Sequence, residues 1–177
     1  YTYNSISNND IYLIFNQSVS RGVDKMFLYN LETKQQAEIS NQPANHRGQG
    51  FDKDDKNYYY TTNFEGEFYY LMSYNIETGA RSLVYKTEWD VVNSYLSKKD
   101  SYRVITVNED AQNKIIVNDS KDGSSLKFKG VDNLNINSVS FSDDETLIRI
   151  NAASSNSPGD IYVYSLLTDE LKKITSK

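Results

Sequence analysis

Phe141-Ser142-Asp143-Asp144-Glu145 is the stretch that decides the fold, because its pattern occurs four times in the chain. Each copy has an apolar residue, a small or acidic residue, two polar residues and a final acid. The copies begin at intervals of 45 residues, at Ile6, Phe51, Leu96 and Phe141. Three equal intervals indicate an internal repeat, and repeats of this length are typical of solenoids, propellers and arrays.

A run of residues that favour β-strands follows each copy. The runs are Ile11–Phe15, Asn57–Thr62, Tyr102–Val107 and Thr146–Ile150. The chain must reverse between pattern and run, and Asn and Asp tolerate the left-handed backbone that a tight turn needs. Asn9-Asp10, Asp54-Asp55 and Lys99-Asp100 fit this prediction, whereas Glu145 is the poorest fit and is left unexplained.

A second repeated segment lies later in each unit. Tyr29-Asn30-Leu31-Glu32-Thr33 matches Tyr74-Asn75-Ile76-Glu77-Thr78-Gly79, and Tyr164-Ser165-Leu166-Leu167-Thr168 falls at the same place in the last unit. Val117-Asn118-Asp119-Ser120 is a degenerate third copy. The spacings of 45, 43 and 47 residues indicate that insertions fall in loops, as repeat units normally vary.

Each unit reads as four short antiparallel strands. In the last unit we expect strands at Asn137–Phe141, Thr146–Asn151, Asp160–Leu166 and Leu171–Thr175. Four strands in about 45 residues is a β-propeller blade, and no helical apolar stripe supports a helical solenoid. The sequence therefore predicts an all-β chain, a single partial propeller of four consecutive four-stranded blades at residues 1–46, 47–91, 92–136 and 137–177.

Composition agrees with a sheet protein and argues against two classes of partner. The 177 residues include 15 Tyr and 7 Phe, which suit half-buried pleated surfaces. The formal net charge of −5 and the absence of a basic stripe argue against nucleic acid, and no apolar run is long enough to cross a bilayer. There is no Cys, so disulfides and thiolate chemistry are excluded, while bacterial cytoplasm and periplasm both stay open.

The search for catalytic residues finds none. A nucleophilic Ser elbow reads G-x-S-x-G, and the nearest approach, Gly123-Ser124-Ser125-Leu126-Lys127, lacks the final Gly. His46 is the only histidine, and we interpret it as a polar residue of the loop Asn45–Gly50 rather than a catalytic base. One His and no Cys also exclude the usual zinc sites.

Two acidic clusters have structural interpretations. Asp52–Asn57 offers three carboxylates, but it departs from the calcium-loop order at Lys56, so we interpret it as a solvated turn. Glu109-Asp110 could contact a substrate, and a charged loop between strands is the preferred interpretation. The sequence thus predicts no catalytic, metal or cofactor site and no cofactor, and it leaves substrate-binding residues unknown.

Aromatic residues cluster in the second unit, at Tyr58-Tyr59-Tyr60, Phe64 and Phe68-Tyr69-Tyr70. They could form a stacking platform for a ligand. Because adjacent strand residues point to opposite faces, packing between neighbouring blades is the preferred interpretation, and we expect Trp89 to anchor blades in the same way. Gly48 and Gly50, on an expected innermost strand, indicate a close backbone approach or a bulge.

The repeats resemble known propellers. Phe141–Glu145 is similar to the F-S-P-D-G turn of TolB-like propellers and of prolyl oligopeptidase-family serine peptidases, and the second segment resembles their Y-D-L-x-T-G turn. More specifically, Glu67–Leu71, Tyr74–Gly79, Glu88–Val91 and Val107–Asp110 resemble the propeller of bacterial peptidases related to acylaminoacyl peptidases. The turn Pro and Gly of the family are missing from all four copies.

The resemblance implies a function that composition does not show. In this family a propeller of seven or eight blades caps and gates an α/β-hydrolase domain. In a parent chain that domain would follow Ile174–Lys177. The channel of the propeller would admit short peptides to its active site. The alternative is a TolB-like envelope module that binds a protein partner; a propeller lyase or glycosidase is disfavoured by the missing His cluster. Four blades alone would expose apolar end faces and favour self-association.

Overall fold

A computed structural model describes residues 1–132, 134–154 and 157–175. All paired strands are antiparallel and no helix occurs among these residues, which confirms the all-β prediction. The first sheet contains β1 (Thr2–Ile6), β2 (Tyr12–Ser20), β3 (Val23–Asn30) and β4 (Gln36–Glu38). The second contains β5 (His46–Phe51), β6 (Asn57–Thr62), β7 (Tyr70–Asn75) and β8 (Arg81–Tyr85).

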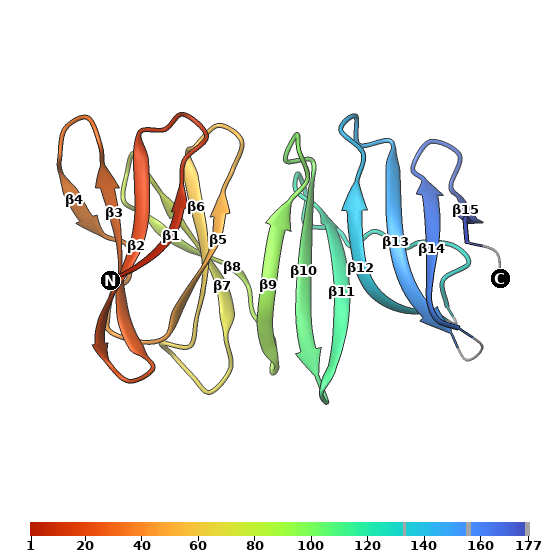
Figure 1. Ribbon diagram of the computed structural model, residues 1–177, viewed down its shortest axis with the longest axis horizontal. Coiled ribbons are helices and arrows are strands. Elements are labelled where there is room, and N and C mark those ends of the chain that lie inside the picture. The colour runs from red at the N-terminus through yellow and green to blue at the C-terminus, as the bar shows by residue number, and fades with distance from the viewer. Residues whose placement is uncertain (133, 155–156, 176–177) are drawn as a thin grey trace. The chain divides into compact units, whose positions relative to one another are not determined.

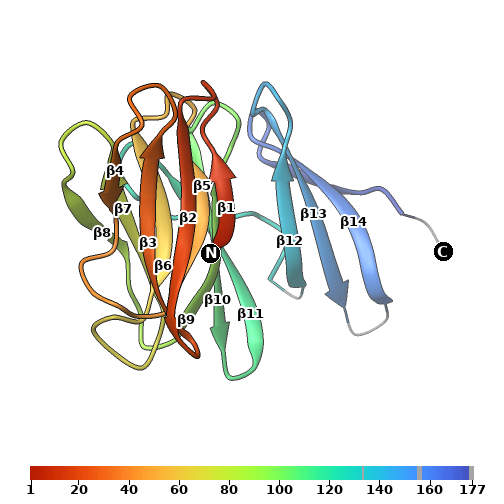
Figure 2. The same cartoon turned by 60° about the vertical axis from the view of Figure 1, so that its left-hand side comes forward.

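The third sheet contains β9 (Asp90–Leu96), β10 (Tyr102–Glu109) and β11 (Gln112–Asp119). The fourth contains β12 (Asn135–Phe141), β13 (Leu147–Ser154), β14 (Ser157–Ser165) and β15 (Glu170–Lys173), and three of these strands lie side by side in Figure 2. In every sheet the strand order follows the chain, as in a propeller blade (Figure 1).

The third sheet departs from the predicted four strands. Its fourth strand is reduced to one bridge, Asn118 to Ser125, and a hydrogen bond from the Leu126 N–H to the Val117 carbonyl at 2.7 Å. The residues at the place of a fourth strand, Ser125–Lys129, alternate polar and apolar side chains, and Leu126 and Phe128 pack on the core without forming a longer ladder.

The chain divides into two compact units, Tyr1–Asn93 and Ser94–Lys177. The first unit contains the first two sheets, and the second contains the fourth sheet and most of the third. The first strands β5, β9 and β12 begin one or two residues before the blade boundaries that the sequence predicts.

The turn of the first repeat has the same geometry in all four copies. Its last residue has a positive φ each time: 60° at Asp10, 55° at Asp55, 63° at Asp100 and 61° at Glu145. The second residue donates its N–H to the start of the next strand, at 2.8–3.0 Å, in the pairs Ser7 to Tyr12, Asp52 to Asn57, Ser97 to Tyr102 and Ser142 to Leu147. The predicted left-handed turn is therefore confirmed, and Glu145 obeys it too.

The second repeat needs one correction. The N–H of Asn30 bonds to the carbonyl of Gln35, Asn75 bonds to Ala80, and Asp119 bonds to Ser124, each at 2.8 Å. Asp119 is therefore the structural equivalent of Asn75. The degenerate third copy is displaced by one residue from the predicted alignment, because Asn118 occupies the place that Tyr74 has in the second repeat.

Each unit has its own apolar core. In the first, a cluster joins the facing surfaces of the two sheets: Ile14, Met26, Leu28 and Ile39 with Tyr58, Tyr60 and Tyr74. In the second, the cluster contains Val104, Val117, Val139, Ile148, Ile150, Ala152, Tyr162 and Tyr164. Sheets within a unit therefore pack face to face through alternate strand residues.

Candidate functional site

His46 lies at the start of β5 and is 4% exposed, so its predicted place in a loop is wrong. Its Nε2 lies 3.0 Å from the Gln42 carbonyl oxygen. A carbonyl only accepts hydrogen bonds, so Nε2 carries the proton and Nδ1 is left as an acceptor in the neutral ring. Burial lowers the pKa of His46, against the opposing effects of the Gln42 hydrogen bond and the Asp24 and Glu38 charges.

The β5 backbone beside His46 approaches its neighbours closely, as predicted. A Cβ at Gly48 would lie 2.1 Å from the Tyr58 hydroxyl and 3.1 Å from Asn4 Oδ1. The pairing of β5 with β6 shifts between Gly48 and Gly50, and Gly50 has a φ of 109°. Both predictions for these glycines, close approach and a bulge, are confirmed.

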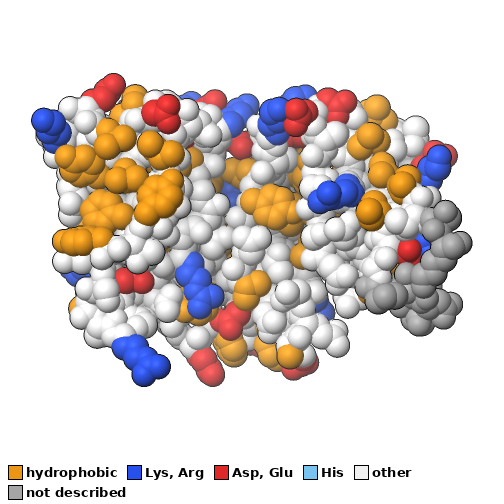
Figure 3. All heavy atoms as spheres, in the orientation of Figure 1, with side chains coloured by type: hydrophobic (Ala, Val, Ile, Leu, Met, Phe, Trp, Pro, Cys, Tyr) orange, Lys and Arg blue, Asp and Glu red, His pale blue; other side chains and the backbone are white. Residues whose placement is uncertain are grey.

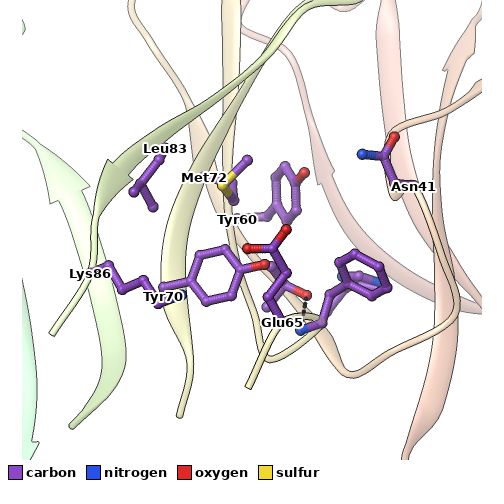
Figure 4. A pocket seen from close by; sticks show the side chains of 10 residues that line it. Asn41, Tyr60, Glu65, Tyr70, Met72, Leu83 and Lys86 are labelled. Atoms are coloured by element: carbon purple, nitrogen blue, oxygen red, sulfur yellow. Dashed lines mark hydrogen bonds between the residues drawn. The ribbon is translucent and has the colours of Figure 1, made fainter. Parts of the chain in front are cut away.

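An aromatic hollow lies on one side of His46, with a volume of about 110 Å³. It is lined by side chains that include Tyr60, Phe64, Glu65, Tyr70, Met72 and Lys86. Figure 4 shows the Glu65 carboxylate pointing toward the rings of Tyr60 and Tyr70. Lys86 Nζ lies 4.9 Å from the centroid of the Tyr70 ring. The lining of the hollow thus combines aromatic and apolar side chains with polar ones, among them one carboxylate and one ammonium group.

The aromatic residues of the second sheet have two environments, the apolar core and the aromatic hollow. Tyr58, Tyr60 and Tyr70 are 0%, 3% and 5% exposed, which confirms core packing for these three rings. Burial raises the pKa of Tyr58 and of Tyr60 to about 12. Phe64 is 42% exposed, and it lines the aromatic hollow together with Tyr60 and Tyr70. Trp89 contacts Phe68, at 6.1 Å between ring centroids, and is partly buried.

A polar hollow also has His46 in its lining, together with the end of β2 and the start of β3. Its volume is about 410 Å³, and its lining includes Thr2, Asn4, Asn16, Asp24, His46 and Arg47. The Asn16 amide links three neighbours: its Oδ1 accepts from Asn4 Nδ2 at 2.7 Å, its Nδ2 donates to the His46 carbonyl at 2.8 Å, and its side chain is also hydrogen-bonded to Asp24. No sequence motif surrounds Asp24, so the sequence did not predict that Asp24 and His46 line the same hollow.

The acidic turn Asp52–Asn57 is not simply solvated, which corrects the sequence interpretation. Asp52 is 9% exposed and accepts hydrogen bonds from the N–H groups of Lys56 and Asn57. Asp55 is 6% exposed and accepts the N–H groups of Asn8 and Asn9 from the first sheet. The carboxylates therefore fix the turn and join two sheets, and no cluster of three potential metal ligands occurs in the described part of the chain.

Glu109 and Asp110 form the charged loop that was preferred. Glu109 ends β10, Asp110 and Ala111 have φ values of 49° and 60°, and β11 begins at Gln112. Positive φ at both central residues is the signature of a type I′ hairpin. Glu109 also pairs with Lys114 across the hairpin at 2.6 Å.

Comparison with known proteins agrees with this geometry. Residues 2–177 match the family described as prolyl oligopeptidase, N-terminal β-propeller domain. The chain belongs to this family. A search of curated protein sequences finds no match.

Several solved structures share the fold. TolB from Acinetobacter baumannii aligns over 100% of this chain and 43% of its own, with TM-score 0.62 and 15% identity. A puromycin-hydrolyzing peptidase from Mycobacterium tuberculosis aligns over 98% and 29%, with TM-score 0.70 and 10% identity. Prolyl oligopeptidase B from Galerina marginata aligns over 97% and 26%, with TM-score 0.68 and 13% identity. This propeller chain spans less than half the length of each.

The propeller's described residues contain no helix that is long and apolar enough to cross a membrane.

Proposed function

We propose that this propeller controls the access of polypeptides to the active site of a serine peptidase domain in a longer protein. The observation that supports the proposal is the family match, which extends over residues 2–177. The propeller would contribute sterically, by admitting short flexible peptides and excluding folded proteins, and the partner domain would supply the α/β-hydrolase chemistry.

The surroundings of His46 agree with a non-catalytic role. Its Nε2 is bound to a backbone carbonyl, and the ring makes no hydrogen bond to a serine hydroxyl among the described residues. A general base must reach the proton it removes within hydrogen-bond distance. We therefore expect the isolated chain to hydrolyse no peptide or aminoacyl substrate.

The test compares the parent protein with the isolated chain. For the parent, kcat/KM should fall steeply as a peptide substrate is lengthened and should be negligible for a folded protein containing the same cleavage sequence. For the isolated chain, turnover should be absent. Equal rates on peptide and folded protein, or turnover by the isolated chain, would contradict the proposal.

A TolB-like protein-binding module is the alternative, and the TolB structural neighbours favour it. The coding sequence after Lys177 separates the two functions. A segment of about 250 residues with a G-x-S-x-G elbow supports the peptidase, and a stop codon with a protein partner recovered on the propeller supports the TolB-like module.

We also propose that this chain associates with itself when it is isolated. Tyr1 is 86% exposed and packs edge-on against Phe15, which stacks on Phe27. Hydrophobic side chains gather over the first sheet at the left of Figure 3. Sedimentation velocity should show a concentration-dependent dimer that Tyr1→Ser and Phe15→Ser weaken, and a monomer at all concentrations would exclude it.

A further inference from the structure

The outer edge of β11 differs from the outer edges of the other third strands. In all four sheets the turn after the third strand contains the same hydrogen bond, in which an N–H donates at 2.9 Å to the carbonyl four residues earlier. The pairs are Lys34 to Asn30, Gly79 to Asn75, Gly123 to Asp119 and Asp169 to Ser165. The residues three positions before these carbonyls are therefore equivalent: Phe27, Met72, Ile116 and Tyr162.

Three of these equivalent residues are paired with a fourth strand. Phe27 pairs with Glu38, Met72 with Leu83, and Tyr162 with Lys173. Ile116 has no such fourth-strand partner in the part of the chain that the structure describes. The ladder of the third sheet therefore stops at the place where the other three continue.

The backbone of β11 directs hydrogen-bonding groups to this edge. The Val117 carbonyl accepts from the Leu126 N–H at 2.7 Å, so it points away from β10. Alternate residues of a strand face the same edge, and the pairing of β11 with β10 is unbroken along its whole length. Asn113 and Ile115 therefore also point their N–H and carbonyl groups outward, where no backbone partner occurs among the described residues. Two donors and two acceptors are thus aligned for one more strand.

A hollow of about 370 Å³ lies beside this edge, and we call it the edge hollow. Its lining combines polar residues of the segment 125–132 with apolar side chains that also pack against the core of the second unit: Ile115, Leu126, Phe128, Val131 and Ile136. Ile115 belongs both to the edge and to this lining. A residue opposite Ile115 in a ladder would have its side chain on the same face as the Ile115 side chain, beside these apolar groups.

Charge favours a peptide over a second copy of the chain as the added strand. Lys114 lies between Asn113 and Ile115 and points to the opposite face of the sheet. Its side chain is 54% exposed although it pairs with Glu109. Two β11 edges paired antiparallel about Ile115 would set their two Lys114 side chains diagonally on one face, where like charges repel. A peptide can instead place an acid opposite Lys114.

We propose that the outer edge of β11 binds an extended peptide, which alternates apolar with acidic residues, as an antiparallel fourth strand. The peptide would continue the ladder of β9, β10 and β11 in the way that β4, β8 and β15 continue theirs. In such strand addition, main-chain hydrogen bonds give affinity and alternate side chains give specificity. Apolar residues would lie opposite Asn113 and Ile115, and an acidic residue would lie opposite Lys114. The proposal does not depend on the peptidase function, because it requires only residues of the second unit.

The probe is a dye-labelled, capped heptapeptide that alternates valine with glutamate, titrated with the chain and followed by fluorescence anisotropy. In an antiparallel ladder the valine amides would face β11 and the glutamate amides would face solvent. Methylation of the valine amide nitrogens should therefore abolish binding, whereas methylation of the glutamate amide nitrogens should leave it unchanged. A peptide with lysine in place of glutamate should bind more weakly, because it meets Lys114 with a like charge.

Amide hydrogen exchange locates the peptide on the strand. The N–H groups of Lys114 and Ile116 face β10, so they should exchange slowly with and without peptide. The N–H groups of Asn113 and Ile115 face the open edge, so they should exchange rapidly in the free chain and slowly when the peptide is bound. Binding elsewhere on the chain would not produce this alternation.

Two variants of one exposed residue test the edge. Asn113→Pro removes an outward N–H but no hydrogen bond to β10, and proline is tolerated on edge strands. It should weaken binding of the valine–glutamate peptide by about threefold to tenfold. The matched control, Asn113→Ser, keeps the N–H and should bind unchanged. Both variants lose the contact of Asn108 Nδ2 with Asn113 Oδ1 at 3.1 Å, and circular dichroism checks that both fold.

Four results would overturn the proposal. The first is the absence of saturable binding, and the second is equal binding of the two methylated peptides. The third is slow exchange of Asn113 and Ile115 in the free, dilute chain, which would mean that the chain's own segment 127–129 closes the edge. The fourth is protection of these amides that grows with protein concentration in the absence of peptide, which would make a second copy the occupant.

Discussion

The Glu145 carboxylate accepts the backbone N–H of Lys99 at 2.6 Å. Lys99 belongs to the equivalent turn of the preceding sheet, one repeat earlier in the chain. The same contact occurs in the first unit, where Asp55 accepts the N–H groups of Asn8 and Asn9 at 2.9 and 2.8 Å. Within each compact unit the acid at the end of the repeated pattern, Asp55 or Glu145, therefore joins its turn to the turn before it, and the longer Glu145 does this as well as an aspartate.

Removal of this carboxylate should destabilise the first unit. Asp55→Gly keeps the positive φ without strain but leaves the N–H groups of Asn8 and Asn9 without their acceptor. Because Asp55 is 6% exposed, we expect a loss of about 1–3 kcal/mol in the free energy of unfolding, measured by urea denaturation.

The matched control is Asp10→Gly. Asp10 has the same place in its turn and a φ of 60°, but it is exposed. Its replacement should change the unfolding free energy by less than about 0.5 kcal/mol. Equal losses in the two variants would mean that the turn, and not the contact between sheets, is responsible.

Another pair that links equivalent turns should matter little. Lys98 and Asp143 form an ion pair at 2.5 Å, with 64% and 84% of their side chains exposed. Exposed pairs contribute about 0–1 kcal/mol, and salt screens them. Lys98→Met should therefore leave the urea midpoint almost unchanged, and a shift as large as that of Asp55→Gly would show that exposure is a poor guide here.

The repeat was predictable because the same backbone turn needs the same residue types every time. A positive φ favours Asn, Asp or Gly, so Asp10, Asp55 and Asp100 indicate the turn in the sequence. The contacts between turns were not predictable from the sequence. Asp55 binds backbone N–H groups, and because almost every residue type has one, no particular partner residue marks the contact. For the same reason the hollow around His46 was missed: Asp24 comes from the start of β3, and only the packing of two sheets brings it to β5.

Gly48 offers a test of packing with an internal rescue. An alanine Cβ there would lie 2.1 Å from the Tyr58 hydroxyl, so Gly48→Ala should cost about 1–3 kcal/mol of unfolding free energy. Tyr58→Phe removes that oxygen and its weak contact with Ser5 at 3.4 Å. In the double variant the loss should be smaller than the sum of the two single losses by about 1 kcal/mol or more. Additive losses would place the clash elsewhere.

His46 should make stability depend on pH in one direction. Burial lowers its pKa from the usual 6.5, so the unfolded chain takes up a proton first as the pH falls. Stability is then complete above about pH 6.5 and declines below it, by up to about 1.4 kcal/mol per pH unit. His46→Gln should flatten this slope in a urea denaturation series. If the dependence of the unfolding free energy on pH is unchanged in His46→Gln, another group causes it.

Asp144 should titrate at an unusually low pH although it is exposed. Hydrogen bonds from the Ser142 side chain, the Thr146 N–H and the Thr146 hydroxyl lower its pKa from 3.8 to about 2. The Ser142 Oγ lies 2.6 Å from Asp144 Oδ1, and the first turn repeats this contact between Ser7 and Asn9 at 2.6 Å, where no charge is present. Ser142→Ala removes the largest of the three effects, so the carboxyl carbon signal of Asp144 should titrate at a higher pH in a ¹³C NMR series. Ser7→Ala provides the control, because it breaks the equivalent bond in a turn that has Asn9 in place of the acid. If Ser142→Ala leaves the pKa of Asp144 unchanged, the depression comes from Thr146 alone.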